Sequence, residues 1–119
     1  MPAGFQFARG DVVLDLAAAT ATANSGVISA PQEGGPLLFA AHVTAITGTT
    51  PTLDVTVEQS ANGSSGWAAI TGSALTQITA VGHRVGFVSP TQPYVRVVAT
   101  IGGTTPSVTG RIAVVVFAD

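Results

Sequence analysis

The chain has 119 residues, a length that corresponds to one domain with one core. Charged residues make up only 8% of it, against about 25% in typical domains, and the formal net charge is −2. This balance excludes the basic surface that nucleic-acid binding requires and a polybasic membrane contact, while the lack of cysteine excludes disulfides and cysteine nucleophiles.

Residues 1–10 are interpreted as an N-terminal arm. Phe5 and Phe7 stand among small residues, and the pattern offers this segment no strand partner. The arm either frays or docks its two rings on a neighbouring subunit. A signal peptide would begin with a positive charge followed by an apolar run, and neither occurs here. We therefore expect synthesis in a cytosol.

Residues 11–119 are predicted to form one all-β domain. Residues 11–16 begin it, and threonines lower the helix propensity of 17–23 enough to favour extended structure there. Alternation of apolar and polar residues indicates half-buried strands at 39–45, 53–58 and 95–101. Shorter candidates are 67–70, 75–81 and 84–88. The apolar run 112–118 is far shorter than a membrane span and indicates a buried strand.

Two similar segments occur 55 residues apart, ITGTTP at 46–51 and IGGTTP at 101–106. Glycine permits a positive φ and proline suits the first residue of an outgoing strand, so each segment is predicted to be a hairpin turn. One hairpin in each of two packed sheets gives an antiparallel two-sheet β-sandwich or jelly-roll-like domain.

Residues with catalytic potential are few. His42 and His83 do not have the spacing of a metal motif, so no metal site is expected. Asp54 and Glu58 share one strand face, which indicates a solvated face in preference to a catalytic carboxylate pair. Nucleophile-elbow and phosphate-loop motifs are also missing. We expect no enzyme activity and no cofactor.

The scarcity of charge has a consequence for the surface. Most of it must consist of small and hydroxyl-bearing residues, or else be covered by another protein. A partner surface is the more economical explanation. The alternative is a threonine-rich β surface that stays soluble through its hydroxyl groups alone.

Four segments carry a resemblance to a known group of proteins. They are GTTPTLDVTVEQS at 48–60, Gly66-Trp67, YVRV at 94–97 and GGTTPS at 102–107. Over residues 10–117 the sequence resembles the small β-rich virion proteins of tailed bacteriophages that act as capsid decoration, or cement, proteins. The loop 60–67 departs from the pattern, because such proteins often have Asp-Gly before the tryptophan and this chain has Asn62-Gly63 and a further Ser-Ser-Gly.

The resemblance implies a structural role on the outside of a virion. A decoration protein binds the assembled lattice of the major capsid protein, commonly as a homotrimer, and stabilises it by bridging neighbouring subunits. The expected partners are thus the major capsid protein and other copies of this chain, with no nucleic acid and no membrane. The alternatives are a phage tail, fibre or carbohydrate-binding β-sandwich module and, less favoured, an enzyme. The residues to which we assign contact roles are Phe5, Phe7, Arg9, Trp67, Arg84 and Arg96.

Overall fold

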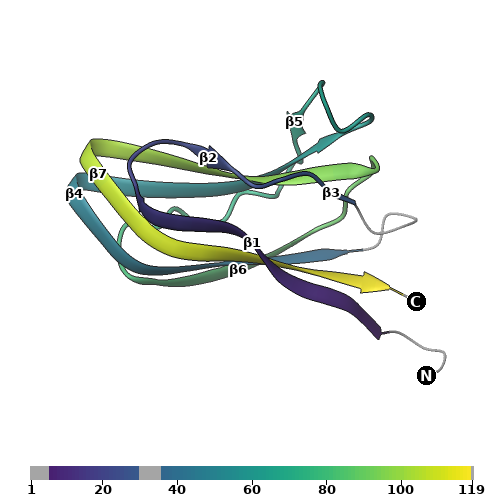
Figure 1. Cartoon of the computed structure of the whole chain (residues 1–119), viewed down its shortest axis with the longest axis horizontal. Coiled ribbons are helices and arrows are strands. Elements are labelled where there is room, and N and C mark those ends of the chain that lie inside the picture. Colours follow the sequence, from purple (N-terminus) through teal and green to yellow (C-terminus); the bar gives the residue numbers. More distant parts are fainter. Residues whose placement is uncertain (1–5, 30–35, 119) are drawn as a thin grey trace.

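The structure is a computed structural model that describes residues 6–29 and 36–118. The described part of the chain is all-β and contains no helix (Figure 1). The alternating apolar pattern and the many β-branched residues account for this result. The strands are β1 (Gln6–Ala19), β2 (Ala23–Asn24), β3 (Ile28–Ser29), β4 (Leu37–Ser60), β5 (Ala68–Ala69), β6 (Gly82–Val88) and β7 (Tyr94–Ala118).

All strand pairs in the described residues are antiparallel and belong to one sheet of seven strands. Its main order is β1-β7-β4-β5, while β2 and β3 also pair with β7 and β6 pairs with β4. The sheet does not close into a barrel. The long strands β4 and β7 are its centre, because they pair with each other over almost their whole lengths.

Both central strands bend sharply at their midpoints, at the left end of the molecule in Figure 1. The two bends are the segments predicted to be hairpin turns, and that prediction was wrong. Residues 46–51 and 101–106 lie within the continuous strands β4 and β7, side by side, with Thr49 opposite Thr104. A single sequence cannot distinguish a reversal of the chain from a bend, because both require glycine and both tolerate proline.

The two bends fit against each other reciprocally. Gly48 and Gly103 have positive φ values of 120° and 109°. A Cβ atom on Gly48 would lie 2.7 Å from the carbonyl oxygen of Thr105, and one on Gly103 would lie 2.6 Å from that of Thr50. Each bend therefore needs a glycine where the backbone of the other bend approaches, and the two copies are related by a local two-fold axis near Thr49 and Thr104.

The bends fold the sheet over on itself. The β6 half consists of β1, β6, residues 37–47 of β4 and residues 107–118 of β7. The β5 half consists of β2, β3, β5, residues 52–60 of β4 and residues 94–102 of β7. The two halves lie one above the other in Figure 1, so a single folded sheet takes the place of the two separate sheets expected from the sequence.

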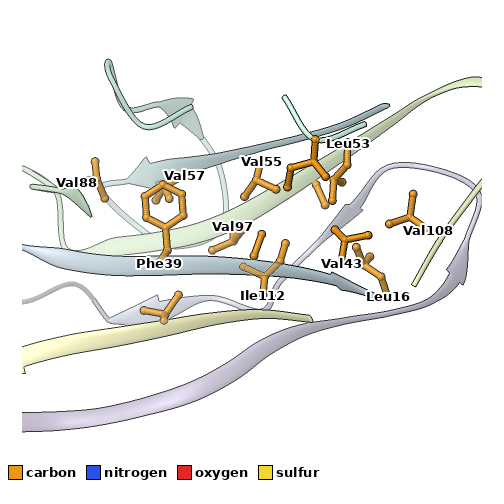
Figure 2. Packing of buried hydrophobic residues seen from close by; sticks show 14 of the residues in the cluster. Leu16, Phe39, Val43, Leu53, Val55, Val57, Val88, Val97, Val108 and Ile112 are labelled. Atoms are coloured by element: carbon orange, nitrogen blue, oxygen red, sulfur yellow. The ribbon is translucent and has the colours of Figure 1, made fainter. Parts of the chain in front are cut away.

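The core lies between the two halves (Figure 2). Away from the bends, every second residue of β4 and β7 points into it, as the alternation predicted. From the β6 half come residues such as Phe39, Val43 and Ile112, and from the β5 half residues such as Leu53 and Val97, all exposed by 1%. The buried apolar residues are Leu16, Leu37, Phe39, Ala41, Val43, Leu53, Val55, Val57, Ile78, Val88, Val95, Val97, Ala99, Val108, Ile112 and Val114.

Several local expectations are changed by the fold. Ala45 was placed on the buried face with Val43, but a bulge between them turns Ala45 outward. Residues 75–81 form no strand and contribute only a single bridge between Ile78 and Leu53. Residues 6–10, which had no partner by pattern, belong to β1 and pair with the end of β7. Residues 1–5 lie outside the described part.

Candidate interaction surface

The outward side of the β6 half carries apolar residues from four adjacent strands. On β4, Leu38 and Ala40 alternate with buried residues and therefore point away from the core. Leu38 lies opposite Phe87 of β6, and Ala40 lies opposite Val85. Both rows continue onto β7, at Val115 and Ala113, and the second continues onto Val12 of β1. This apolar face consists of Val12, Leu38, Ala40, Val85, Phe87, Ala113 and Val115.

The apolar face is accessible to a partner. Val12 is 52% exposed, Val85 58% and Phe87 63%, and the other members are half-buried. The seven side chains, each covering about 4.8 Å by 6.6 Å of one face of a sheet, give the face an area of roughly 220 Å². Exposed apolar side chains that gather on one face of a protein can mark an interaction site.

Gly86 explains why β6 directs its large residues outward. It lies between Val85 and Phe87 and points into the core, where an added Cβ would lie 3.1 Å from Cζ of Phe39 and 2.7 Å from Cδ2 of Leu75. The core has no room for a larger residue at this position. The exposed Val85 and Phe87 are therefore not displaced core residues, because the core is filled without them.

A row of polar residues borders the apolar face. Asp15 of β1, Arg111 of β7, His42 of β4 and His83 of β6 are consecutive neighbours across the sheet. The Nε atom of Arg111 lies 3.5 Å from Oδ1 of Asp15. The rings of His42 and His83 meet edge to face with centroids 5.7 Å apart. All four side chains are exposed, so the border supplies charge and hydrogen-bonding groups beside an apolar surface.

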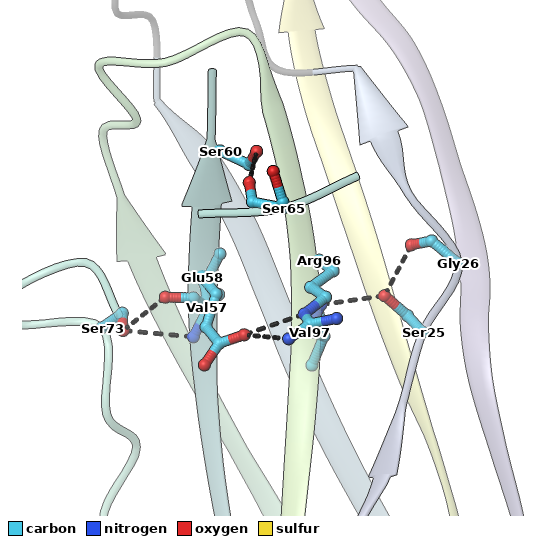
Figure 3. A network of polar contacts seen from close by, with 9 residues as sticks. All are labelled: Ser25, Gly26, Val57, Glu58, Ser60, Ser65, Ser73, Arg96 and Val97. Carbon is cyan, nitrogen blue, oxygen red and sulfur yellow. Dashed lines mark hydrogen bonds and ion pairs between the residues drawn. The ribbon is translucent and has the colours of Figure 1, made fainter. Parts of the chain in front are cut away.

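The outward side of the β5 half is different, because its charged groups bind one another. Arg96 of β7 lies opposite Glu58 of β4. Its Nε atom donates to Oε1 of Glu58 at 2.8 Å, and its Nη2 atom lies 2.7 Å from the same oxygen (Figure 3). The guanidinium carbon also lies 4.5 Å from the ring centre of Trp67. About three quarters of the Arg96 and Glu58 side chains are buried, so ion pair and ring form one internal cluster.

The two carboxylates of this face have separate partners. Glu58 binds Arg96, whereas both oxygens of Asp54 accept hydrogen bonds from Nε2 of Gln77, at 3.1 and 3.0 Å. The interpretation of Asp54 and Glu58 as a polar strand face agrees with this geometry. Neither carboxylate is directed at the other as an acid–base pair would be.

The edges of the β5 half are closed by serine side chains. The Oγ atom of Ser25 accepts a hydrogen bond from the backbone N–H of Val97 at 2.8 Å. On the opposite edge, Oγ of Ser73 accepts from the N–H of Val57 at 3.1 Å and donates to its carbonyl oxygen at 3.2 Å (Figure 3). Val57 and Val97 are themselves a register pair. These contacts occupy backbone groups that would otherwise be open to another strand.

The loop 60–66 is held by its own polar groups. Oδ1 of Asn62 accepts from the backbone N–H groups of Ser64 and Ser65, both at 2.9 Å, and Oγ of Ser60 donates to the carbonyl oxygen of Ser65 at 2.6 Å. The loop packs on an aromatic ring, since a Cβ atom on Gly63 would lie 3.2 Å from Cγ of Tyr94. The chain reverses its direction over this loop, because β5 pairs antiparallel with the end of β4.

The predicted contact residues do not form one site. Trp67 and Arg96 are together, but they bind each other within the β5 half. Arg84 is exposed on β6 and donates to the carbonyl oxygen of His83 at 3.0 Å. The backbones of Phe7 and Arg9 lie in β1, opposite residues 117 and 116 of β7. Phe5 is outside the described residues, and the role of the arm stays a prediction.

The apolar face was missed because its residues are far apart in the sequence. Val85 and Phe87 lie on one face of a segment that was predicted to be a strand, and Arg84, Gly86 and Val88 lie on the other. The face of Val85 and Phe87 is the more apolar, so alternation alone favours its burial and does not indicate an exposed surface. Gly86 is the one local indication that Val85 and Phe87 point outward. It can be interpreted only when the position of Phe39, which leaves no room for a larger residue at 86, is known.

Within the described ranges, no cluster of three or more histidine or acidic residues has the arrangement of a metal site. The same residues include no helix long and apolar enough to cross a bilayer.

Comparison with known proteins identifies the fold. No protein-family model matches the chain, and no curated protein matches its sequence. Among solved structures, the chain is similar to the structure titled "Crystal structure of PBSX exported protein XepA", with a TM-score of 0.66 at 12% sequence identity. The match covers 92% of this chain but only 37% of that protein. The likeness therefore shows a shared fold over nearly the whole of this chain and about a third of XepA.

Proposed function

We propose that this chain is a structural protein of a tailed-phage virion that decorates the capsid by binding the assembled lattice of the major capsid protein. The apolar face is the observation that carries the proposal. Large apolar side chains on the outside of an ordered sheet, in a chain with so few charges, are suited to contact with another protein. The sequence resemblance to virion proteins and the fold likeness to an exported protein support the same role.

The apolar face is assigned to the capsid contact. The folded sheet supplies a rigid, sandwich-like body, so little conformational entropy is lost on binding. The border residues Asp15 and Arg111 place both signs of charge at the edge of the contact, where they favour one orientation on a repeated lattice. A protein that binds only the assembled lattice shifts the equilibrium away from disassembly.

A trimer fits the size of this face. An area of roughly 220 Å² is about a quarter of what each partner contributes to a standard protein interface. One copy would therefore bind weakly. Three linked copies that bind neighbouring capsid subunits would gain affinity through their high effective concentration at the lattice, without any additional contact per copy.

Binding to capsids tests the proposal directly. The chain is mixed with particles assembled from the major capsid protein of the same genome and sedimented, and light scattering gives the mass of the free protein. We expect co-sedimentation and a mass of three copies. Failure of the unmodified chain to sediment with the particles would remove the capsid-binding function, and a monomeric mass would remove the trimer.

Substitutions test the assignment of the apolar face separately. The double variant Val85→Thr with Phe87→Thr keeps β-branched or β-compatible residues on β6 but removes the apolar contact area. The control Thr100→Ala alters an exposed residue of the β5 half. We expect the double variant to lose capsid binding and the control to retain it. Equal binding by all three proteins would place the contact elsewhere on the chain.

The rings of Trp67 and Tyr94 do not favour the carbohydrate-binding alternative. A sugar platform requires exposed aromatic rings. Arg96 lies over the ring of Trp67, and the loop at Gly63 lies against Tyr94. These two rings are engaged within the chain and do not offer a shared open platform.

A further inference from the structure

We propose that His42 and His83 form a binding site for a divalent transition-metal cation such as Zn²⁺. The two residues are direct cross-strand neighbours on β4 and β6 and both side chains are exposed. No hydrogen bond joins either ring to another of the described residues, which leaves ring nitrogens open to a ligand. Imidazole is the most common metal-binding side chain in proteins.

The separation of the two rings suits one shared ion. A Zn–N bond of about 2.0–2.1 Å and a tetrahedral angle place the centres of two bound imidazoles about 5 Å apart. The observed centroids are 5.7 Å apart and the ring planes are inclined by 78°. A small rotation about the side-chain torsions is enough to direct one nitrogen of each ring at a common point. The remaining positions of the ion are then filled by water.

The surrounding charges permit a cation. Arg111 of β7 lies opposite His42 on the side away from His83, and its positive charge disfavours a second cation nearby. That charge is compensated by Asp15, 3.5 Å from the Arg111 guanidinium. Arg84 follows His83 on β6, but its guanidinium is turned to the carbonyl oxygen of His83. The exposed position also keeps water near the site and weakens repulsion between these groups.

Sequence spacing could not show this pair. Metal motifs are recognised by ligands that lie a few residues apart, whereas these two histidines are brought together by the register of two strands. A site with two protein ligands binds less tightly than a structural site with four, so each histidine should be indispensable.

Calorimetric titration of the full chain with ZnCl₂ tests the site. We expect one ion per chain. Loss of a residue that only positions a metal ligand lowers the affinity for the metal about 10–100-fold. His42 and His83 would be ligands themselves, so His42→Ala and His83→Ala should each lower the affinity for Zn²⁺ by at least about 10-fold. Unchanged affinity in either variant, or no binding to the unmodified chain, would overturn the proposal.

A matched control keeps the number of histidines constant. In the variant His83→Ala with Val85→His, the second histidine lies opposite Ala40 and diagonal to His42, about 7–8 Å away across the strands. We expect this variant to bind Zn²⁺ as weakly as His83→Ala. Retention of the original affinity would show that two nearby histidines suffice without the cross-strand pairing, which contradicts the proposed geometry.

A spectroscopic measurement on the unmodified chain is independent of any variant. With Cu²⁺ bound, electron paramagnetic resonance should show coupling to two imidazole nitrogens. Coupling to one nitrogen only would reject the shared site. Circular dichroism confirms that the variants keep the β-fold.

Discussion

The outward faces of the two halves of the sheet differ, although their inward faces are alike. Each half contributes alternate apolar residues of β4 and β7 to one core. On the outside, the β5 half pairs its charges within the chain. Arg96 binds Glu58 and also lies over the ring of Trp67. The β6 half instead exposes Val85 and Phe87. The contrast is between a face whose charged groups are paired within the chain and a face that leaves large apolar side chains exposed.

The edges of the two halves of the sheet also differ. Serine side chains from neighbouring loops bind the outer backbone groups of β4 and β7 in the β5 half. In the β6 half the corresponding positions are occupied by the longer strands β1 and β6. In the β5 half they are occupied by the short strands β2, β3 and β5 together with these serines.

The largest expected effect concerns the inward face that both halves share. Phe39→Ala should lower the free energy of unfolding by about 3–5 kcal/mol, because the ring is 1% exposed and its loss leaves a cavity between the halves. Denaturant unfolding measures the change. A loss below about 1 kcal/mol would mean that the two halves do not pack as described.

An intermediate effect should distinguish the ion pairs of the two outward faces. Arg96→Ala should cost about 1–2 kcal/mol, since it removes a partly buried pair and the contact with Trp67. The matched variant Arg111→Ala should change stability by less than about 0.5 kcal/mol, because the Arg111–Asp15 pair is about 70% exposed. Similar losses in the two variants, measured by thermal or denaturant unfolding, would contradict the contrast between the faces.

The smallest effect on stability is expected on the apolar face. Phe87→Thr should change the free energy of unfolding by no more than about 0.5 kcal/mol, because the ring is 63% exposed and threonine is compatible with a strand. Its effect should fall on association instead, seen as a lower affinity for capsids. A loss of stability close to that of Phe39→Ala would show that Phe87 is a core residue of the isolated chain.

Much of the β structure followed from local patterns. The alternation at 53–58 and 95–101 correctly predicted which residues point inward, because a strand places successive side chains on opposite faces regardless of its neighbours. The extended conformation expected for 17–23 is found only in part, because β1 ends at Ala19, β2 begins at Ala23 and Ala18 has a positive φ of 50°. Patterns failed at Ala45, where a bulge that depends on the pairing with β7 reverses the alternation.

The two bends show where local information ends. The glycines and prolines of 46–51 and 101–106 indicated two similar changes of chain direction, and the structure contains two related bends. Whether each was a hairpin or a bend depended on Thr105 and Thr50, whose backbones approach Gly48 and Gly103 from the other strand. The sequence of either segment alone does not reveal this contact between the two bends.

The candidate sites were likewise predicted only in part from the sequence. The scarcity of charge indicated a surface that meets another protein, but the residues chosen for contact included Trp67 and Arg96, which bind each other. The apolar face and the histidine pair are made by residues from separate strands. The amino-acid sequence by itself determined the β conformation and most of the inward-facing residues of β4 and β7, because these depend on neighbours along the chain. Only the tertiary structure decided the folded sheet and its two different outward faces, because register and the approach of distant strands set which side chains become neighbours.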